Sequence, residues 1–87
     1  MREMPTSKKT DMQIKVKFFG ALTEITGTSE ITLSSDTTDA CHDEVKRRFP
    51  LILQYSYAIA LNAAWLKENK KLNDGDELAF LPPFSGG

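Results

Sequence analysis

The sequence predicts an α+β fold: a mixed sheet of about five strands with one main helix across one face. Two kinds of pattern support this prediction. Apolar and polar residues alternate near both ends of the chain, as in strands, whereas one central segment repeats its apolar residues at helical spacing. The resulting element order is strand, strand, helix, strand, strand, strand, which suits a sheet covered by a single helix.

Length and composition indicate one globular domain. The chain has 87 residues, of which 40% are hydrophobic and 26% charged, a balance that is typical of a folded domain. Eleven basic and twelve acidic residues give a net charge of −1, so no broad positive field would attract nucleic acid or an anionic membrane. We therefore expect neither nucleic acid nor a membrane as a partner.

Cysteine usage and the hydropathy pattern predict a cytoplasmic protein. The single cysteine, Cys41, cannot form an internal disulfide, which fits a reducing compartment. The sequence has no apolar run of about 18 residues and no apolar signal-peptide segment. Residues 1–12 are polar and predict a disordered extension or residues added during cloning, followed by a domain at 13–81 and a flexible tail at 82–87.

The first half of the predicted domain begins with a strand pair. In IKVKFF, alternation places Ile14, Val16 and Phe18 on the inward face. ALTEITG then predicts a loop or short helical turn. SEITLS alternates again, with Ile31 and Leu33 inward, so we expect a hairpin between the two strands.

The segment DTTDACHDEVKRRF predicts the main helix. Its apolar side chains recur at Cys41, Val45 and Phe49, which places them on one face. One of its two threonines can cap the amino end, and the early acidic and late basic residues match the helix dipole. Pro50 ends the helix.

The second half of the domain predicts three short strands. YAIALN and AWLKEN are the first two, and NDGDE is a turn with Asp-Gly at its centre. The last strand is ELAFLP, where Pro82 and Pro83 lack the amide hydrogens that a longer ladder would need. The first and last strands are candidates for a parallel pair at the centre of the sheet.

The sequence finishes with two glycines after this strand. At average glycine usage of about 7%, two glycines at two given positions occur by chance with a probability of roughly 0.005. A terminal α-carboxylate, with a pKa of about 3.3 to 3.7, is an anion and a poor electrophile at neutral pH. Another enzyme would have to activate it, for example as an acyl-adenylate, and a tail without side chains could enter a narrow active site. The alternative interpretation is a frayed end with no role.

The residues between the last strand and the terminus fit insertion into such a site. Docking six flexible residues costs on the order of 6 to 12 kcal/mol of backbone entropy. Two consecutive prolines lower this cost because they fix φ and favour an extended path, and an aromatic residue can anchor the tail. The predicted tail-insertion residues are Pro82, Pro83, Phe84, Ser85 and Gly86.

Three large side chains predict a partner-binding patch. Phe19, Trp65 and Leu81 should lie on the sheet face away from the helix, because their strand neighbours take the inward positions. Exposed apolar patches with aromatic residues commonly mark protein interfaces. Two alternatives remain: the faces could be reversed, or Trp65 could fold over the sheet edge.

The remaining reactive side chains do not predict a self-contained active site. Cys41 has the helical spacing of a small core residue. His42 has no second His or Cys at ligand spacing, so we expect no metal site. Asp74 and Asp76 flank Gly75 as turn residues without an acid or base beside them.

Two stretches together, IKVKFFGALTEITG and LNDGDELAFLPPFSGG, resemble the sulfur-carrying small subunits of molybdopterin synthase, a β-grasp family related in fold to ubiquitin. The likeness covers most of residues 13–87. It implies that Gly87 is the working residue, adenylated by an ATP-dependent, ubiquitin-activating-like adenylyltransferase. Sulfur would then replace AMP to give a terminal thiocarboxylate, and the protein itself would bind no cofactor.

The resemblance also implies a partner and a reaction. The tail would enter the large subunit of the synthase and donate sulfur to cyclic pyranopterin monophosphate, in a heterotetramer of two small and two large subunits. On this interpretation the chain is a cosubstrate and not an enzyme by itself, and the predicted patch docks the large subunit. The alternatives are a carrier for thiamine thiazole synthesis, a ubiquitin-like protein modifier and a passive interaction module. The two adjacent phenylalanines and the two prolines favour a carrier for molybdopterin synthase over the thiazole carrier.

Overall fold

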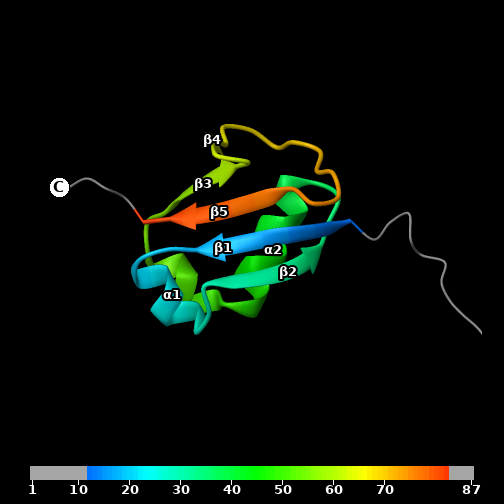
Figure 1. The fold of residues 1–87 in the computed structure, drawn as a ribbon. Helices are drawn as coiled ribbons and strands as arrows, with labels where there is room; N and C mark the ends of the chain where they lie inside the picture. The colour runs from blue at the N-terminus through cyan, green and yellow to red at the C-terminus, as the bar shows by residue number, and fades with distance from the viewer. Residues whose placement is uncertain (1–11, 83–87) are drawn as a thin grey trace, which may run out of the picture.

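The computed structural model describes residues 12–82, which form a five-stranded mixed sheet with the order β2-β1-β5-β3-β4. Figure 1 shows α2 crossing one face of this sheet. The strands are β1 (Gln13–Phe18), β2 (Glu30–Ser34), β3 (Ala58–Leu61), β4 (Ala64–Trp65) and β5 (Glu77–Leu81), and the helices are α1 (Ala21–Thr26), α2 (Thr38–Arg48) and the 3-10 helix η2 (Pro50–Gln54). Residues 1–11 and 83–87 lie outside the described part.

The strand pairing confirms the predicted topology. β1 pairs antiparallel with β2, as expected for the hairpin, and parallel with β5, with Phe18 opposite Phe80. β5 pairs antiparallel with β3 on its other side. The first and last strands are therefore central and parallel, which together with the helix across one face makes the fold a ubiquitin-like β-grasp.

The core lies between the sheet and α2, and it follows the predicted alternation. Phe18 and Phe80 meet with ring centroids 5.6 Å apart, and Phe18 contacts Phe49 edge-on at 5.7 Å. Cys41 and Val45 are fully buried on the helix, as the spacing predicted. The buried cluster consists of Ile14, Val16, Phe18, Leu22, Leu33, Cys41, Val45, Ile52, Leu72, Leu78 and Phe80.

The amino end of α2 shows which threonine caps the helix. Thr37 is the N-cap, and its Oγ1 accepts a 3.1 Å hydrogen bond from the backbone amide of Ala40. Thr38 is buried, and its Oγ1 accepts a 2.9 Å hydrogen bond from the amide of Lys70. The second threonine therefore joins the helix to the segment before β5.

The sequence pattern does not predict the 3-10 helix η2. α2 ends at Arg48, as expected before Pro50, but the chain continues at once into η2. Proline fits the first position of a helical turn because its missing amide would have no partner there. The apolar residues that follow have no strand or helix period, so the pattern gave no signal for this turn.

The turn before β5 has the predicted form and fixes the last strand. Gly75 has φ 90°, a value that favours glycine. Asp74 Oδ1 accepts a 2.8 Å hydrogen bond from the amide of Gln13, which begins β1. Asp76 Oδ2 accepts a 2.8 Å hydrogen bond from the amide of Asn73. Both aspartates thus serve the turn and align β5 with β1.

Candidate functional site

The predicted tail, residues 82–87, follows the carboxyl end of β5 in the sequence. This strand ends at Leu81, and Pro82 is the last residue that the structure describes. The other predicted tail-insertion residues, Pro83, Phe84, Ser85 and Gly86, lie outside the described residues, as does Gly87. The structure therefore defines the base of the tail and the surface around it.

Phe19 and Leu81 lie on neighbouring segments at this end of the sheet. The amide of Phe19 donates a 3.1 Å hydrogen bond to the carbonyl of Phe80, so the parallel β1–β5 contact continues just beyond β1. Each residue follows a buried phenylalanine of the opposite face, which places both on the side away from α2. Phe19 is 43% exposed, and Leu81 is partly buried.

Trp65 lies on the same face but on the edge strand β4. It is 56% exposed and pairs with Ala60 of β3, which in turn pairs with Ala79 of β5. Two strand spacings, about 10 Å, therefore separate Trp65 from β5. The structure thus brings Phe19 and Leu81 together and places Trp65 at a distance across the sheet.

Small residues fill the space between these side chains. Ala60 points away from α2, yet only 7% of it is exposed, as expected for an alanine beside a tryptophan. We call Phe19, Leu81, Ala79, Ala60 and Trp65 the apolar strip. The sequence pattern does not single out either alanine, because only the strand register shows that they line up between the larger residues.

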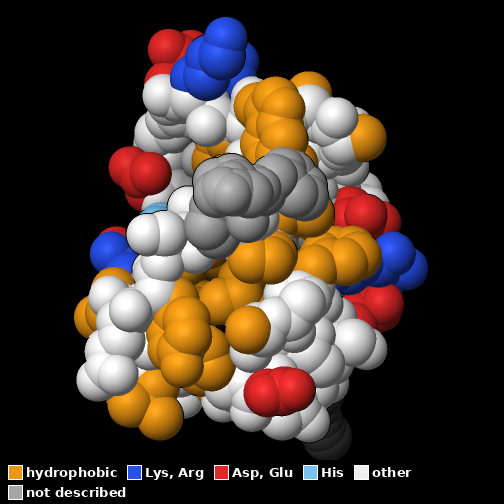
Figure 2. Space-filling model, turned by 90° about the vertical axis from the view of Figure 1, so that its left-hand side faces the viewer, with side chains coloured by type: hydrophobic (Ala, Val, Ile, Leu, Met, Phe, Trp, Pro, Cys, Tyr) orange, Lys and Arg blue, Asp and Glu red, His pale blue; other side chains and the backbone are white. Residues whose placement is uncertain are grey.

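A second group of exposed apolar side chains, not predicted from the sequence, lies on and just after η2. Leu51 and Leu53 of η2 are 57% and 61% exposed, and Tyr55 just after it is 48% exposed. Figure 2 shows the end of the molecule at which β5 finishes, where apolar side chains gather over much of the surface. The run PLILQY was the available signal, but it does not show which of its residues face solvent.

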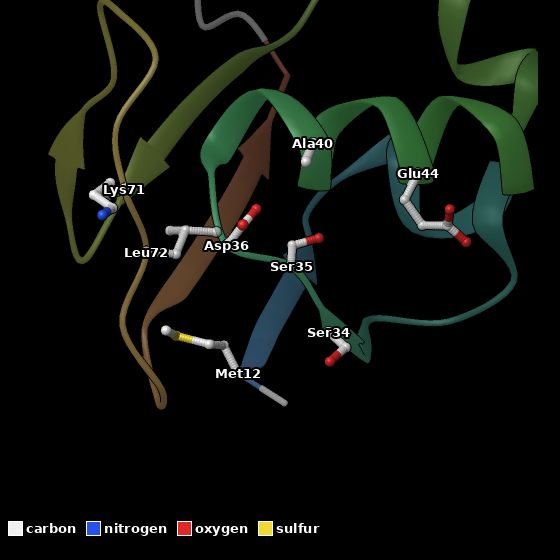
Figure 3. A pocket seen from close by; sticks show the side chains of 8 residues that line it. All are labelled: Met12, Ser34, Ser35, Asp36, Ala40, Glu44, Lys71 and Leu72. Carbon is white, nitrogen blue, oxygen red and sulfur yellow. The ribbon is translucent and has the colours of Figure 1, made fainter. Parts of the chain in front are cut away.

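A hollow of about 570 Å³ lies at the opposite end of the sheet, beside the start of β1 and the end of β2 (Figure 3). Met12, Asp36, Glu44 and Lys71 are among the residues that line it. Arg48 and Arg47 donate hydrogen bonds to the Glu44 carboxylate, and these bonds lower its pKa. The carboxylate is thereby held in its charged form, which does not suit a general acid. Since β1 and β5 are parallel, this hollow is remote from the base of the tail.

Cys41 is a core residue, as predicted. Its side chain is fully buried, and burial raises the pKa of the thiol to about 11, although a hydrogen bond with Ser35 partly opposes this shift. The thiolate, which is the nucleophilic form, is therefore disfavoured at neutral pH.

His42 packs among aromatic rings. Its Nε2 lies 2.7 Å from Tyr57 Oη, and its ring centroid is 5.6 Å from that of Phe80. Burial, and to a smaller extent Lys46, lowers the pKa of His42. Within residues 12–82, no three His, Cys, Asp or Glu side chains are grouped so that they could hold a metal ion. No helix in the same part of the chain is long and apolar enough to cross a membrane.

These features define a class: a small, ubiquitin-like β-grasp domain with an apolar strip beside the carboxyl end of β5. The chain belongs to the ThiS family, whose model matches residues 16–87. It is 35% identical over 83 residues to the molybdopterin synthase sulfur carrier subunit of Arabidopsis thaliana, an alignment that covers 90% of this chain and 86% of that protein.

Two solved structures show the same fold. One is the small archaeal modifier protein 1 of Methanosarcina acetivorans, with a TM-score of 0.78, 26% identity and coverage of 88% of this chain and 98% of that one. The other is the complex of subunits 1 and 2 of the molybdopterin-converting factor from Helicobacter pylori 26695. The matching chain of that complex has a TM-score of 0.69 and 28% identity, covering 87% of this chain and 100% of that one.

Proposed function

We propose that this chain is a sulfur carrier in molybdenum cofactor biosynthesis and that Gly87 carries the sulfur as a thiocarboxylate. The observation that carries the proposal is that the central strand β5 ends at Leu81 and is followed in the sequence by the short segment that finishes with Gly-Gly. The similarity to molybdopterin synthase sulfur carrier subunits supports the same role.

The chemistry would proceed in two steps at the terminal carboxylate. Its oxygen attacks the α-phosphorus of ATP in a partner adenylyltransferase, which gives an acyl-adenylate and releases pyrophosphate. A hydrosulfide equivalent then attacks the acyl carbon and expels AMP, leaving the thiocarboxylate. Adenylation is needed because the free carboxylate is already ionised at neutral pH and is a poor electrophile.

The chain would supply a thin, extended C-terminal segment for this chemistry. Pro82 and Pro83 favour an extended backbone, in which each residue advances about 3.1 Å. The five residues after Pro82 would therefore reach about 15 Å from the domain. Glycine at the last two positions leaves no side chain to obstruct a narrow channel, and Phe84 would anchor the tail before them.

The apolar strip would dock the large subunit while the tail enters its active site. The strip lies at the base of the tail, so a single partner can contact both. The structure from Helicobacter pylori is itself a complex of subunits 1 and 2, which supports a partner of this kind. A Lys17–Glu77 ion pair of 3.4 Å lies on the same sheet face and provides a polar rim. We propose that two such pairs assemble into a heterotetramer.

One alternative function has a specific observation in its favour. The structure with a TM-score of 0.78 is named a small archaeal modifier protein, so the same fold is compatible with protein conjugation. A modifier would share the adenylation step, but a lysine amine, and not sulfur, would become joined to Gly87. The named sulfur carrier relatives favour the molybdopterin pathway over thiamine thiazole synthesis and over a passive module.

Intact mass spectrometry separates these functions. The protein is incubated with ATP, sulfide and a candidate activating enzyme, and its mass is compared with that of a variant extended by one alanine after Gly87. Exchange of one oxygen for one sulfur in the wild type alone would support the carrier. Adducts with other proteins would support a modifier, and an unchanged mass with every activating enzyme would contradict both.

A further inference from the structure

The first residue of the tail packs against a glycine in a distant part of the sequence. Gly20 links β1 to α1 and has φ 59° and ψ −139°, a conformation that side-chain-bearing residues rarely adopt. A Cβ built at this position would lie 2.8 Å from Pro82 Cγ and 3.5 Å from Pro82 Cδ. Even an alanine therefore cannot occupy position 20 unless Pro82 shifts.

The corner that carries Gly20 is firmly held. The amide of Phe19, just before it, donates to the Phe80 carbonyl at 3.1 Å, which fixes the corner to β5. The carbonyl of Gly20 accepts a 3.0 Å hydrogen bond from the amide of Thr23, and Thr23 Oγ1 donates a 3.1 Å hydrogen bond to the carbonyl of Phe18. The corner is thus a hydrogen-bonded surface against which the proline ring lies.

Pro82 has few ways to avoid a group added at position 20. Its ring fixes φ near −65°, and the proline that follows it restricts ψ to extended values. The preceding Leu81 is held in the sheet opposite Ala58. A collision at the ring would consequently be relieved by turning the tail itself.

We propose that Gly20 is a positioning residue that sets the direction in which the C-terminal tail leaves the domain. Because position 20 has no side chain, the Pro82 ring can pack against the β1–α1 corner. This contact sets the direction of the residues that follow Pro82. The proposal rests on the proposed function for its consequence in sulfur transfer, but the direction of the tail can be measured without any activity.

The test uses variants that create the contact with Pro82, leave it out or relieve it. Gly20→Ala introduces the collision, whereas G27A and G75A also place a Cβ at a positive φ but meet nothing within 4 Å. Pro82→Ala removes both Cγ and Cδ, and the nearest Pro82 atom to the new methyl would then be Cβ at 3.8 Å, an ordinary contact. The double variant G20A/P82A should therefore relieve the collision that G20A creates.

The activity readout is single-turnover sulfur transfer from the loaded carrier to cyclic pyranopterin monophosphate in the large subunit. We expect G20A to slow this step by roughly 10- to 100-fold, as misplacement of a reacting group by about 1 Å does. G27A and G75A should transfer at the wild-type rate, and G20A/P82A should match P82A alone. Equal rates for G20A, G27A and G75A would overturn the proposal.

The structural readout is paramagnetic relaxation from a nitroxide on a cysteine appended after Gly87. Cys41 is fully buried, so the appended thiol is labelled selectively. The pattern of broadened amides on residues 12–82 should change in G20A and stay as in the wild type in G27A and G75A. An unchanged pattern in G20A would reject the role of Gly20, even if the wild type transferred no sulfur and the proposed function itself had failed.

Discussion

Phe80 of β5 joins the two halves of the core, because its ring lies 5.6 Å from that of Phe18 on β1 and 5.4 Å from that of Tyr57 before β3. The first and last strands thereby bury their apolar sides together, on the face opposite to the one on which the exposed Phe19 and the partly buried Leu81 lie. The residues that stabilise the core and the residues proposed to bind the partner consequently lie on opposite faces of the same two strands.

We expect Phe80→Ala to destabilise the domain by about 3–5 kcal/mol, because it leaves a large cavity where three aromatic side chains meet. Chemical denaturation monitored by circular dichroism would measure this loss. Trp65→Ala, at an exposed position, should change the free energy of unfolding by much less. Equal losses for the two variants would show that Phe80 does not have the central packing role described here.

The apolar strip predicts a loss of partner binding without a loss of folding. Phe19→Asp and Leu81→Asp each place a charge on the surface that would be buried against the large subunit, and we expect affinity to fall by about 2–4 kcal/mol. Isothermal titration calorimetry with the purified large subunit would measure the change, and circular dichroism would verify the fold.

Thr32→Asp is the matched control for this binding experiment. Thr32 is exposed on β2 and lies opposite Lys15, outside the apolar strip. The substitution adds the same charge to the same side of the sheet, so the affinity of this variant for the large subunit should stay near that of the wild type. Should F19D and L81D bind as tightly as T32D, the strip would not be the docking surface.

Cys41 predicts a loss of stability at high pH. Its pKa in the folded protein is about 11, raised by burial from 9.0. Because the folded state favours the neutral thiol, this stabilisation is complete below pH 9 and is lost as the pH rises towards 11. The loss amounts to about 2–3 kcal/mol.

Comparison with Cys41→Val isolates this contribution. The free energy of unfolding of the wild type, measured between pH 8 and about pH 11, should fall more steeply than that of C41V. Tyr57, whose pKa burial also raises, contributes to both proteins and cancels in the difference. Parallel curves would mean that the thiol is more accessible to water than the structure indicates.

We expect His42 to make the stability of the domain depend on pH in mild acid, more weakly than Cys41 does at high pH. Its pKa is lowered from 6.5, chiefly by burial, so the folded state favours the neutral ring. The contribution of His42 to the free energy of unfolding should be complete above pH 6.5 and should decline as the pH falls below this value. A proton NMR titration of the imidazole would give the folded-state pKa directly. A value at or above 6.5 would contradict the partly buried contacts with Tyr57 and Phe80.

The fold was predictable wherever a local pattern decides it. Alternation identified the buried faces of β1, β2 and β5, and helical spacing identified Cys41 and Val45 on α2. By contrast, η2 has no periodic pattern, since its proline and short apolar run are compatible with a turn, a strand or a loop. Local sequence therefore left this element undetermined.

The surface around the tail was predictable only in part. Phe19 and Leu81 are neighbours because β1 and β5 pair in parallel, which the strand order allowed us to suggest. The distance to Trp65 and the two intervening alanines depend on the register of β3 with β4 and β5. The approach of Gly20 to Pro82 joins residues far apart in the sequence, and no local signal could indicate it.

The most direct test of the sulfur carrier function follows the sulfur itself. The protein loaded with ³⁵S at its terminus is mixed with the large subunit and cyclic pyranopterin monophosphate, and both protein and pterin are analysed by mass spectrometry and radioactivity. We predict that the carrier returns to its unmodified mass while two loaded carriers are consumed for each labelled dithiolene. Label that stays on the carrier, or a dithiolene that forms without label, would contradict the proposal.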